Sequence, residues 1–535
     1  MDLECVGKNC PWRVYAVRME GIEWFQIRRA RLDHNCTIDE RGRFHVQAKT
    51  SVIGDLFKKK YASGVGPRPN ELRELMRDDH DVPISYWKAW RSRDLARDTG
   101  LGTAGNSYKV LPIYLQRLVM SNPGTVVSLE TDYDEGVGQR FKYLFFTLGA
   151  CLNGYPYMRK VLIIDGAHLK GKYTGCLLTA SCQDGNYQLY PVAFGIVDGE
   201  NEKAWSWFFR KLQEVVPDSH DLVFVSDRHN SIFAGLRKVY PMAQHCACVV
   251  HLQRNVQSIF KKKHLSYLVS QAARAYLPSQ FYELFDQIRA VDSGCADYLT
   301  AIGFEHWTRA HFNSLRYNIM TSNVAESLNN VLAAARDYPI VPLIEYIRAT
   351  LMGWFNTRRT LASEISNTLT PKVEEILATN FELSTGFSFR RINQDEFEVR
   401  NKEGVPFLVN LETQACSCHE FQMLLIPCCH AIVAALRSET RVDSLVGIEY
   451  TTAFWNKAYE CSIYPVTMSA PTLPVGDDFS SLNLKPPNTR RPPRRPRKTR
   501  IRSHGEFGGG LPRRSNICGR CGSFGHNRAS CKMPI

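Results

Sequence analysis

Apolar residues gather in short runs through the middle of the chain and predict strands that alternate with helices. Residues 161–164 and 222–225 are continuous apolar runs, and an aspartate follows each of them within two residues. Residues 177–182 and 191–197 have the length and composition of two further strands. Residues 205–216 carry large apolar side chains at helical spacing. The predicted order is three antiparallel strands, a helix and a parallel fourth strand.

This order resembles the RNase H-like α/β fold and makes the two aspartates, Asp165 and Asp227, the first candidates for chemistry. Paired carboxylates can hold divalent cations about 4 Å apart, which is what phosphodiester cleavage needs. Glu326 is a candidate third acid, because it shares the polar face of a predicted helix with Asn323 and Asn330. The pattern alone also fits aspartates that end strands at turns, and a solvated surface glutamate.

Cysteine and histidine spacing divides the rest of the chain. The most compact set has the spacing C-x2-C-x4-H-x4-C, in which four ligands can close on one tetrahedral zinc ion. It resembles a zinc knuckle of the kind that binds single-stranded nucleic acid. Its ligands would be Cys518, Cys521, His526 and Cys531.

A second set resembles the SWIM zinc finger, C-x-C-x(n)-C-x-H. Strands are predicted at 387–392, 396–400 and 406–411, and a helix at 430–437, so that a strand hairpin and a helix start would carry the ligands. Cys429 lies between two ligands and is interpreted as a small buried hydrophobe. The alternative for the whole set is chance clustering. Its ligands would be Cys416, Cys418, Cys428 and His430.

A third set, near the amino end, resembles the zinc site of WRKY and related plant DNA-binding domains. Strands are predicted at 12–18 and 24–31, between its two ligand pairs. Only four residues precede the first ligand, so we expect the upstream strands of such a module to be missing. Its ligands would be Cys5, Cys10, His34 and Cys36. The three sets together predict about three zinc ions per chain.

Composition and charge narrow the class of protein. Hydrophobic residues at 44% exclude a wholly disordered chain, and no apolar run approaches the ~18 residues of a membrane span. Without a signal pattern at the start, we expect a soluble intracellular protein. Its 17 cysteines then favour reduced thiols and metal ligands over disulfides.

The net charge of +14 is concentrated near the carboxyl end. Residues 485–502 contain nine basic residues, five prolines and no acidic residue. This composition predicts an extended segment that serves nuclear import and binds phosphates without sequence preference, or alternatively a solubilising linker. After Lys485 its basic residues are Arg490, Arg491, Arg494, Arg495, Arg497, Lys498, Arg500 and Arg502.

Several segments resemble the transposase domain of plant Mutator-like elements. They are residues 165–171, 184–194, 205–208, 226–228 and 322–327. The resemblance implies a DDE catalytic set at Asp165, Asp227 and Glu326 with Mg²⁺ or Mn²⁺, and a helical insertion at about 252–320. It also covers a Cys-x2-His element at Cys248 and His251, whose role is left open between half a zinc site, a structural element and a DNA contact.

These observations predict an α/β protein with an RNase H-like core, a helical insertion and small flanking zinc-binding modules. The predicted segments are 1–40, a WRKY-like zinc module; 41–158, a mostly helical DNA-binding or linker region; 159–360, the transposase domain; 361–440, the SWIM region; 441–484, a linker; 485–515, a basic and Gly-rich disordered segment; and 516–535, the knuckle.

The function expected from the resemblance is that of a DNA transposase in the nucleus. Its partners would be the inverted repeats at transposon ends, target DNA, single-stranded nucleic acid at the knuckle and further copies of the chain, but no membrane. The alternatives are a domesticated, transposase-derived DNA-binding regulator and an inactive element copy. Retention of all three acids favours the enzyme over the regulator.

Overall fold

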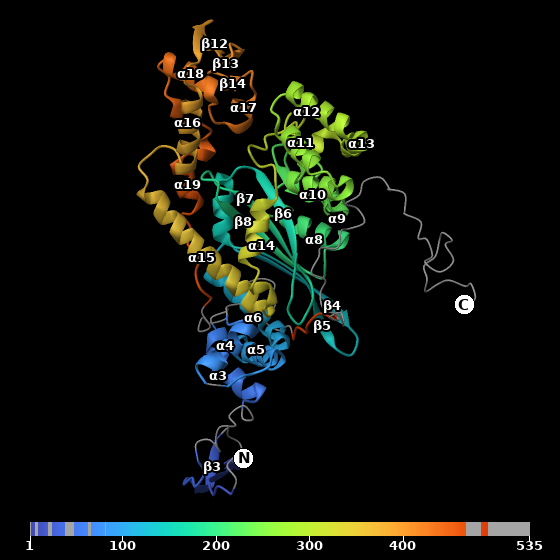
Figure 1. Ribbon diagram of the computed structural model, residues 1–535, viewed down its shortest axis with the longest axis vertical. Coiled ribbons are helices and arrows are strands. Elements are labelled where there is room, and N and C mark those ends of the chain that lie inside the picture. Colours follow the sequence, from blue (N-terminus) through green and yellow to red (C-terminus); the bar gives the residue numbers. More distant parts are fainter. Residues whose placement is uncertain are drawn as a thin grey trace, which may run out of the picture. The chain divides into compact units, whose positions relative to one another are not determined.

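The computed structural model divides the chain into two compact units, drawn in Figure 1. Residues 2–5, 9–19, 24–37, 48–62, 66–80, 82–466 and 483–489 are described. The first unit comprises Met1–Leu111 and Asp337–Tyr346, and the second comprises Pro112–Arg336 and Ile347–Ile535. No helix in the described part of the chain is long and apolar enough to cross a membrane.

The first unit begins with a three-stranded antiparallel sheet of β1 (Asp2–Glu4), β2 (Arg13–Arg18) and β3 (Phe25–Arg31), which confirms the two strands predicted between the ligand pairs. The helices α3 (Thr50–Ala62), α4 (Pro69–Asp78) and α5 (Tyr86–Leu101) form a separate apolar core. Gly54 permits the close approach of α3 to α5, because a Cβ atom there would lie 3.0 Å from the Cβ of Leu95. The helix α6 (Ala104–Ser121) leads into the second unit.

The second unit is built on a mixed seven-stranded sheet in the order β10-β9-β6-β7-β8-β5-β4. Its strands are β4 (Val126–Asp134), β5 (Gly138–Thr147), β6 (Val161–His168), β7 (Cys176–Gln183), β8 (Leu189–Val197), β9 (Val223–Ser226) and β10 (Gln244–Ala247). Strands β6, β7 and β8 are antiparallel, α8 (Glu202–Gln213) follows them, and β9 is parallel to β6. This confirms the strand order predicted from the sequence.

Two strands extend this sheet before residue 159, inside the region that the sequence indicated as mostly helical. The hairpin of β4 and β5 joins the sheet through β8, where Phe146 lies opposite Phe194 and their rings stack. Both side chains are buried. The sheet therefore begins at Val126, about thirty residues before the predicted transposase domain.

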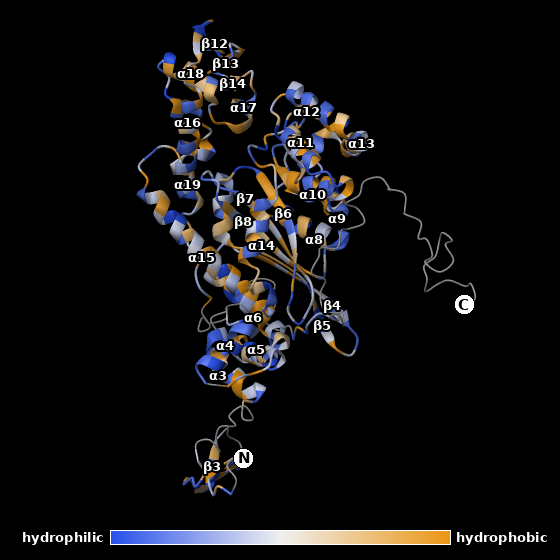
Figure 2. Cartoon of the chain, viewed as in Figure 1, coloured by the Kyte–Doolittle hydropathy of each residue, from blue (hydrophilic) through white to orange (hydrophobic). Residues whose placement is uncertain are grey.

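Helices cover both faces of the sheet. On one face Gly195 of β8 makes room for α8, because a Cβ atom there would lie 2.7 Å from the ring of Phe208. Asp165 of β6 lies on the opposite face. It pairs with Thr179 of β7, which in turn pairs with Phe194 of β8. The helix α14 (Asn323–Val331) packs on this second face. Figure 2 shows the apolar character of β6 and β7 between these helices.

Four helices form the predicted insertion before the third acid. They are α10 (Val249–Phe260), α11 (Lys263–Arg274), α12 (Pro278–Val291) and α13 (Ser293–Ile302). They follow α9 (Asn230–Val239) and β10, and they share a core of their own around Phe281 and Trp307. The insertion is helical as predicted from Val249, three residues earlier than expected, to Ile302, but residues 307–322 form no helix, so the prediction of a helical segment to about 320 is wrong for its last part.

A long helix, α15 (Ile340–Glu364), leads to the SWIM region. This region consists of α16 (Pro371–Leu383), a sheet of β11 (Ser388–Arg391), β12 (Glu396–Arg400), β13 (Pro406–Asn410) and β14 (Ala415–Cys416), then α17 (Glu420–Leu424) and α18 (Cys429–Arg437). The three predicted strands and the predicted helix are confirmed to within one or two residues.

The segment predicted as a linker, 441–484, is in part a structural element. It contains α19 (Thr452–Ala458), and the rings of Tyr450, Trp455 and Tyr459 are buried in the second unit. The linker prediction is therefore wrong for these residues, because aromatic side chains that bury this much surface hold their segment on the core.

Asp184 is the buried carboxylate on which this segment depends. It follows β7, and its side chain accepts hydrogen bonds from the backbone N–H of Gln188 (2.7 Å), Trp455 Nε1 (2.9 Å) and the Tyr459 hydroxyl (2.8 Å). Burial raises the pKa of Asp184, while the Arg358 guanidinium and these donors act in the opposite direction. The side chain of Asp184 thus fastens α19 to the sheet.

We predict that Asp184→Ala lowers the free energy of unfolding by about 3–5 kcal/mol, because it leaves the Trp455 and Tyr459 donors buried without an acceptor. Urea unfolding of the full chain, followed by tryptophan fluorescence, measures this. The matched control is Asp221→Ala, which removes an exposed pair with Lys160 and is expected to cost less than about 1 kcal/mol. Equal losses in the two variants would contradict the assignment.

Candidate functional site

Asp165 and Asp227 stand level with each other at two neighbouring parallel strands. The pairing of β6 with β9 ends at Ile163 opposite Val225, and each aspartate lies two residues further along the chain, Asp165 within β6 and Asp227 just past the end of β9. The sequence predicted that Asp165 ends its strand. This is wrong, because β6 continues to His168 by pairing with β7. The register nevertheless brings the two carboxylates to one edge, as the sequence predicted.

The electrostatics of Asp165 reflect this proximity. Burial, and then the neighbouring carboxylate of Asp227, raise the pKa of Asp165 to about 7. Its Oδ1 accepts from the backbone N–H of Gly166 (2.9 Å), and its Oδ2 accepts from Asn329 Nδ2 of α14 (2.7 Å). Like charges held this close are relieved by a cation between them.

Glu200 is a further carboxylate near this pair, and sequence reasoning missed it. It lies three residues beyond β8, its charge adds to the raised pKa of Asp165, and it accepts a hydrogen bond from the thiol of Cys176 (3.4 Å). Gly166 leaves room for it, because a Cβ atom there would lie 2.8 Å from Glu200 Oε1. With His168 and Cys176, Glu200 forms a group of metal-ligand types whose ligand atoms lie within 4.8 Å of one another.

Asp227 lies in a short loop between β9 and α9, and neighbouring groups hold that loop. Its Oδ1 accepts from the backbone N–H of His229 (3.3 Å). The preceding Ser226 hydroxyl is 2.8 Å from His245 Nε2 and donates to the backbone carbonyl of Asp227 (2.7 Å). Burial lowers the pKa of His245 to about 3, so its imidazole is neutral. The buried His245 thus supports the loop that carries the second acid.

Glu326 is carried by the helix that touches Asp165. It lies three residues before Asn329 on α14, and its Oε1 is 3.0 Å from Arg254 Nη1 and 3.6 Å from His251 Nε2. The buried face of α14 consists of Ala325, Leu328 and Asn329, whereas Val331, where the helix ends, is 39% exposed.

The Cys-x2-His element holds the start of this helix. Cys248 Sγ accepts from the backbone N–H of Ser322 (3.2 Å), and His251 Nδ1 lies 3.3 Å from the Ser322 hydroxyl. Burial tends to raise the pKa of the Cys248 thiol, but bonding to His251 and Ser322 outweighs it, so this pKa lies below its ordinary value. Among the described residues the element belongs to no group of three metal ligands, and its contacts favour the structural role over half a zinc site.

The SWIM set is assembled as the spacing predicts. Cys416 closes β14, Cys428 caps α18 and His430 lies in the first turn of that helix. Together with Cys418, the four ligand atoms lie within 4.8 Å of one another. Both Cys416 Sγ and Cys428 Sγ are 3.8 Å from His430 Nδ1, close to the ~3.5–3.8 Å edges of a tetrahedral zinc site. The ring of Phe407 stacks on the imidazole at 3.8 Å between centroids and fixes its orientation.

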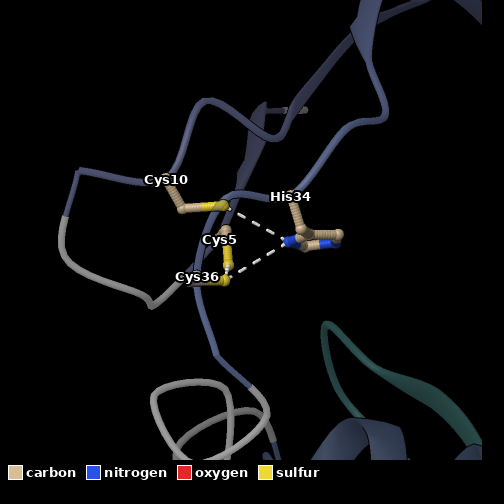
Figure 3. A group of neighbouring side chains, drawn as sticks. All are labelled: Cys5, Cys10, His34 and Cys36. Carbon is tan, nitrogen blue, oxygen red and sulfur yellow. Dashed lines mark hydrogen bonds between the residues drawn. The ribbon is translucent and has the colours of Figure 1, made fainter.

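The amino-terminal set is also brought together, as Figure 3 shows. Cys10 Sγ is 3.3 Å and Cys36 Sγ is 3.6 Å from His34 Nδ1, and Cys5 Sγ is 3.5 Å from Cys36 Sγ. Slight burial acts to raise the pKa of Cys10, but the backbone N–H groups of Trp12 and Asn35 prevail and lower it to about 6. A thiolate at neutral pH beside three further soft donors fits zinc.

Two predicted sites fall outside the described residues. These are the knuckle ligands Cys518, Cys521, His526 and Cys531, and the basic residues from Arg490 to Arg502. The first residue of the predicted basic segment is described, and it pairs with the sheet. Lys485 N donates to Gln139 O (2.9 Å), and Phe141 N donates to Lys485 O (2.9 Å), so the chain returns to β5 at this point.

Comparisons with known proteins agree with the acid pair and with the SWIM set. Residues 161–255 match the MULE transposase domain family, and residues 407–439 match the SWIM zinc finger family. The first match contains Asp165, Asp227 and the Cys-x2-His element, and the second contains all four SWIM ligands. The chain therefore contains a MULE transposase domain and a SWIM zinc finger.

The curated relatives are distant. The transposase for insertion sequence element IS256 in transposon Tn4001, from Staphylococcus aureus and from Enterococcus faecalis, is 30% identical over 117 residues, which is 21% of this chain. The match spans 28% of the length of those transposases. A PKS-NRPS hybrid synthetase from Chaetomium globosum is 20% identical over 200 residues, 37% of this chain and 4% of that protein.

We predict that Cys416→Ser removes one zinc ion per chain, because three ligands and a hydroxyl hold zinc far less tightly than four. Elemental analysis of the purified full chain measures this. Cys429→Ser is the matched control, since Cys429 adjoins the same histidine without belonging to the ligand set. Loss of zinc in the control variant, or retention in Cys416→Ser, would show that the ligand set is wrong.

We also predict that divalent cations bind the acid pair more weakly as pH falls. The folded pKa of Asp165 is about 7, so its carboxylate becomes protonated below that pH and cation affinity drops roughly tenfold per pH unit. Mn²⁺ titration by electron paramagnetic resonance measures the affinity. Glu200→Gln removes a charge that raises this pKa and is expected to move the midpoint to lower pH. Its exposed neighbour Glu202 supplies the control, Glu202→Gln, in which an equal shift would contradict the assignment.

Proposed function

We propose that the chain is a Mutator-like DNA transposase with an RNase H-like catalytic core. The observation that carries this proposal is the level placement of Asp165 on β6 and Asp227 directly after β9, inside the segment that matches the MULE transposase domain. The sequence order of three antiparallel strands, a helix and a parallel fourth strand supports the RNase H-like assignment. The distant relation to the IS256 transposase supports the same reaction class.

The acid pair fits Mg²⁺ or Mn²⁺. The donors are carboxylate oxygens, which these hard cations prefer, and the repulsion that raises the pKa of Asp165 is what a bound cation would relieve. Asp165 and Asp227 would hold the cation, with Glu326 as the third ligand from α14. When bound, the cation polarises the phosphodiester and activates a hydroxyl nucleophile.

The protein's own groups would prepare this site. Asn329 orients Asp165 through its hydrogen bond to Oδ2, and Ser322, fixed by Cys248 and His251, sets the start of the helix that carries Glu326. In the described structure Glu326 is held by Arg254 and His251. Glu326 would therefore exchange these partners for the cation when DNA binds.

The partners that we propose follow from this reaction. They are the inverted repeats at transposon ends and target DNA, with further copies of the chain in the assembled complex. Single-stranded nucleic acid at the knuckle and localisation in the nucleus also belong to the proposal. The zinc modules would supply DNA contacts outside the catalytic core.

We expect Asp165→Asn to abolish metal-dependent strand cleavage with little loss of DNA binding, because it removes a charge that the cation needs and preserves the shape. Glu326→Gln should behave in the same way. Strand transfer on the element's own ends, in Mg²⁺, measures the reaction, and a gel shift in EDTA measures binding. Glu305→Gln, at an exposed glutamate that pairs with His306, tests the alternative third acid, because an indifferent Glu326→Gln with loss of cleavage in Glu305→Gln would move the third ligand to Glu305. Cleavage at the wild-type rate by Asp165→Asn would count against the enzyme and favour a DNA-binding regulator.

Neutralising the eight basic residues from Arg490 to Arg502 should weaken nonspecific DNA binding and flatten its salt dependence, by up to about 0.9 in slope for each phosphate that the variant no longer binds. This variant leaves Lys485 and its pairing with β5 intact. A fluorescent fusion of the variant should also move from nucleus to cytoplasm. An unchanged salt slope together with unchanged nuclear accumulation would leave the segment as a solubilising linker.

A further inference from the structure

A cavity of about 320 Å³ lies between the segment that follows the helical insertion and helix α17 of the SWIM finger. Its polar lining comes from the irregular stretch between α13 and α14 and from α17. The lining groups that bear on its chemistry are Arg309, Asn313, Ser314, Arg316, Tyr317 and Gln422. None of these residues belongs to the acid site or to a zinc set.

Two of these residues are arginines that are almost fully buried. Arg316 is 3% exposed and Arg309 is 7% exposed. Arg316 Nε donates to the backbone carbonyl of Ile319 (3.3 Å), but within the described part of the chain neither Nη1 nor Nη2 of this guanidinium has a hydrogen-bond partner. A buried guanidinium with two unused donor groups beside a cavity destabilises the folded state unless an acceptor occupies that cavity.

The charge balance of the cavity points to an anion. Burial lowers the pKa of Arg309, and Arg316 is close enough to lower it further. Glu420 acts in the opposite direction on Arg309, but among the described residues no carboxylate lies within ion-pair distance of Arg316. One positive charge in the cavity is therefore unbalanced by the described protein.

The arrangement of donors selects the kind of anion. The Nη1 and Nη2 groups of a guanidinium form a planar fork that matches two oxygens of a phosphate. Arg309 is held beside this fork by stacking on Tyr276, at 4.3 Å from the ring centroid, and by donation to Arg274 O (3.4 Å). The Ser314 hydroxyl adds a neutral donor, whereas the Gln422 amide is already bonded to the backbone of Cys416, donating to its carbonyl (3.0 Å) and accepting from its N–H (3.1 Å). Two cations with an additional donor suit a doubly charged, multi-oxygen group better than a single carboxylate.

We propose that this cavity is a phosphate-binding site, with Arg316 as its principal ligand. The phosphate would belong to a nucleic-acid backbone or to a free small phosphate, and the chemistry of recognition is the same for both. Because Gln422 lies on α17 and Arg316 on the segment leading to α14, a bound phosphate would join the SWIM finger to the stretch that leads to the third acid. The cavity would bind phosphate whether or not the chain carries out the transposase reaction.

The first experiment measures thermal unfolding of the full chain in inorganic phosphate and in chloride at equal ionic strength. Phosphate should raise the unfolding temperature of the wild type, because a ligand that binds only the folded state stabilises it. Arg316→Gln should lose this rise, yet unfold in chloride no earlier than the wild type, because it removes an unpaired buried charge. If Arg316 served only to stabilise the fold, Arg316→Gln would unfold in chloride at a lower temperature than the wild type. Arg289→Gln, at an exposed arginine that pairs with Asp286, is the matched control and should keep the phosphate effect.

Calorimetric titration with inorganic phosphate provides a second readout. Arg316→Gln should weaken binding by on the order of tenfold or more, and Ser314→Ala, which leaves both arginines in place, should weaken it a few-fold. Equal phosphate responses in wild type and Arg316→Gln would overturn the site. So would a lower unfolding temperature of Arg316→Gln in chloride combined with unchanged phosphate affinity of Ser314→Ala.

A third measurement distinguishes the two sources of phosphate. If a DNA backbone occupies the cavity, a short duplex should compete with inorganic phosphate, and Arg316→Gln should lower the salt slope of DNA binding by about 0.9, the value for one bound phosphate. If a free phosphate occupies it, the duplex should leave phosphate affinity unchanged. Either outcome supports the site, whereas failure of phosphate to bind the wild type in the first two experiments overturns it whether or not the chain cleaves DNA.

Discussion

The pairing of β6 with β9 is the constraint on which the catalytic half of the structure depends. This pairing holds Ile163 opposite Val225, and the acids stand level with each other two residues further along each segment. A slip of one residue would turn either carboxylate to the opposite face of the sheet, toward α8. The register is specified because both strands are buried, and because β6 is also paired with β7 on its other side. The chemistry therefore rests on apolar residues that take no part in it.

The cost of bringing the acids together is visible in their surroundings. Burial, the second carboxylate and Glu200 make ionisation of Asp165 less favourable, and the backbone N–H of Gly166 offsets part of this by donating to it. Around the pair lies a set of polar contacts, Ser226 with His245 and Ser322 with Cys248 and His251, that fixes the loops and helix on which the acids sit. Such contacts position a site more precisely than the acids could alone.

The features that could be predicted from the sequence are those that appear as short local patterns of residues. Two apolar runs followed by aspartates, and a Cys-x-Cys pair before a Cys-Cys-His triplet, are each contained in a short window, whereas the helical insertion was expected from the family resemblance alone. Asp184 could not be recognised in this way, because its partners Trp455 and Tyr459 lie some 270 residues further on. Glu200 and Arg316 carry no local signal either. Their meaning comes from burial and from groups that only the folded chain brings near.

The two ends of the SWIM region lie side by side within the second unit. Leu369 pairs with Thr451, Thr452 N donates to Thr368 O, and the Thr370 hydroxyl donates to the carbonyl of Gly185. The finger is consequently inserted into the catalytic unit through two adjacent strands of chain, and is not appended after it. A chain that stopped directly behind the finger would lose Trp455 and Tyr459 and leave Asp184 without two of its donors. The zinc finger could thus be exchanged for another module as an insertion between neighbouring anchor points, whereas truncation directly behind the finger would destabilise the catalytic unit by removing these donors.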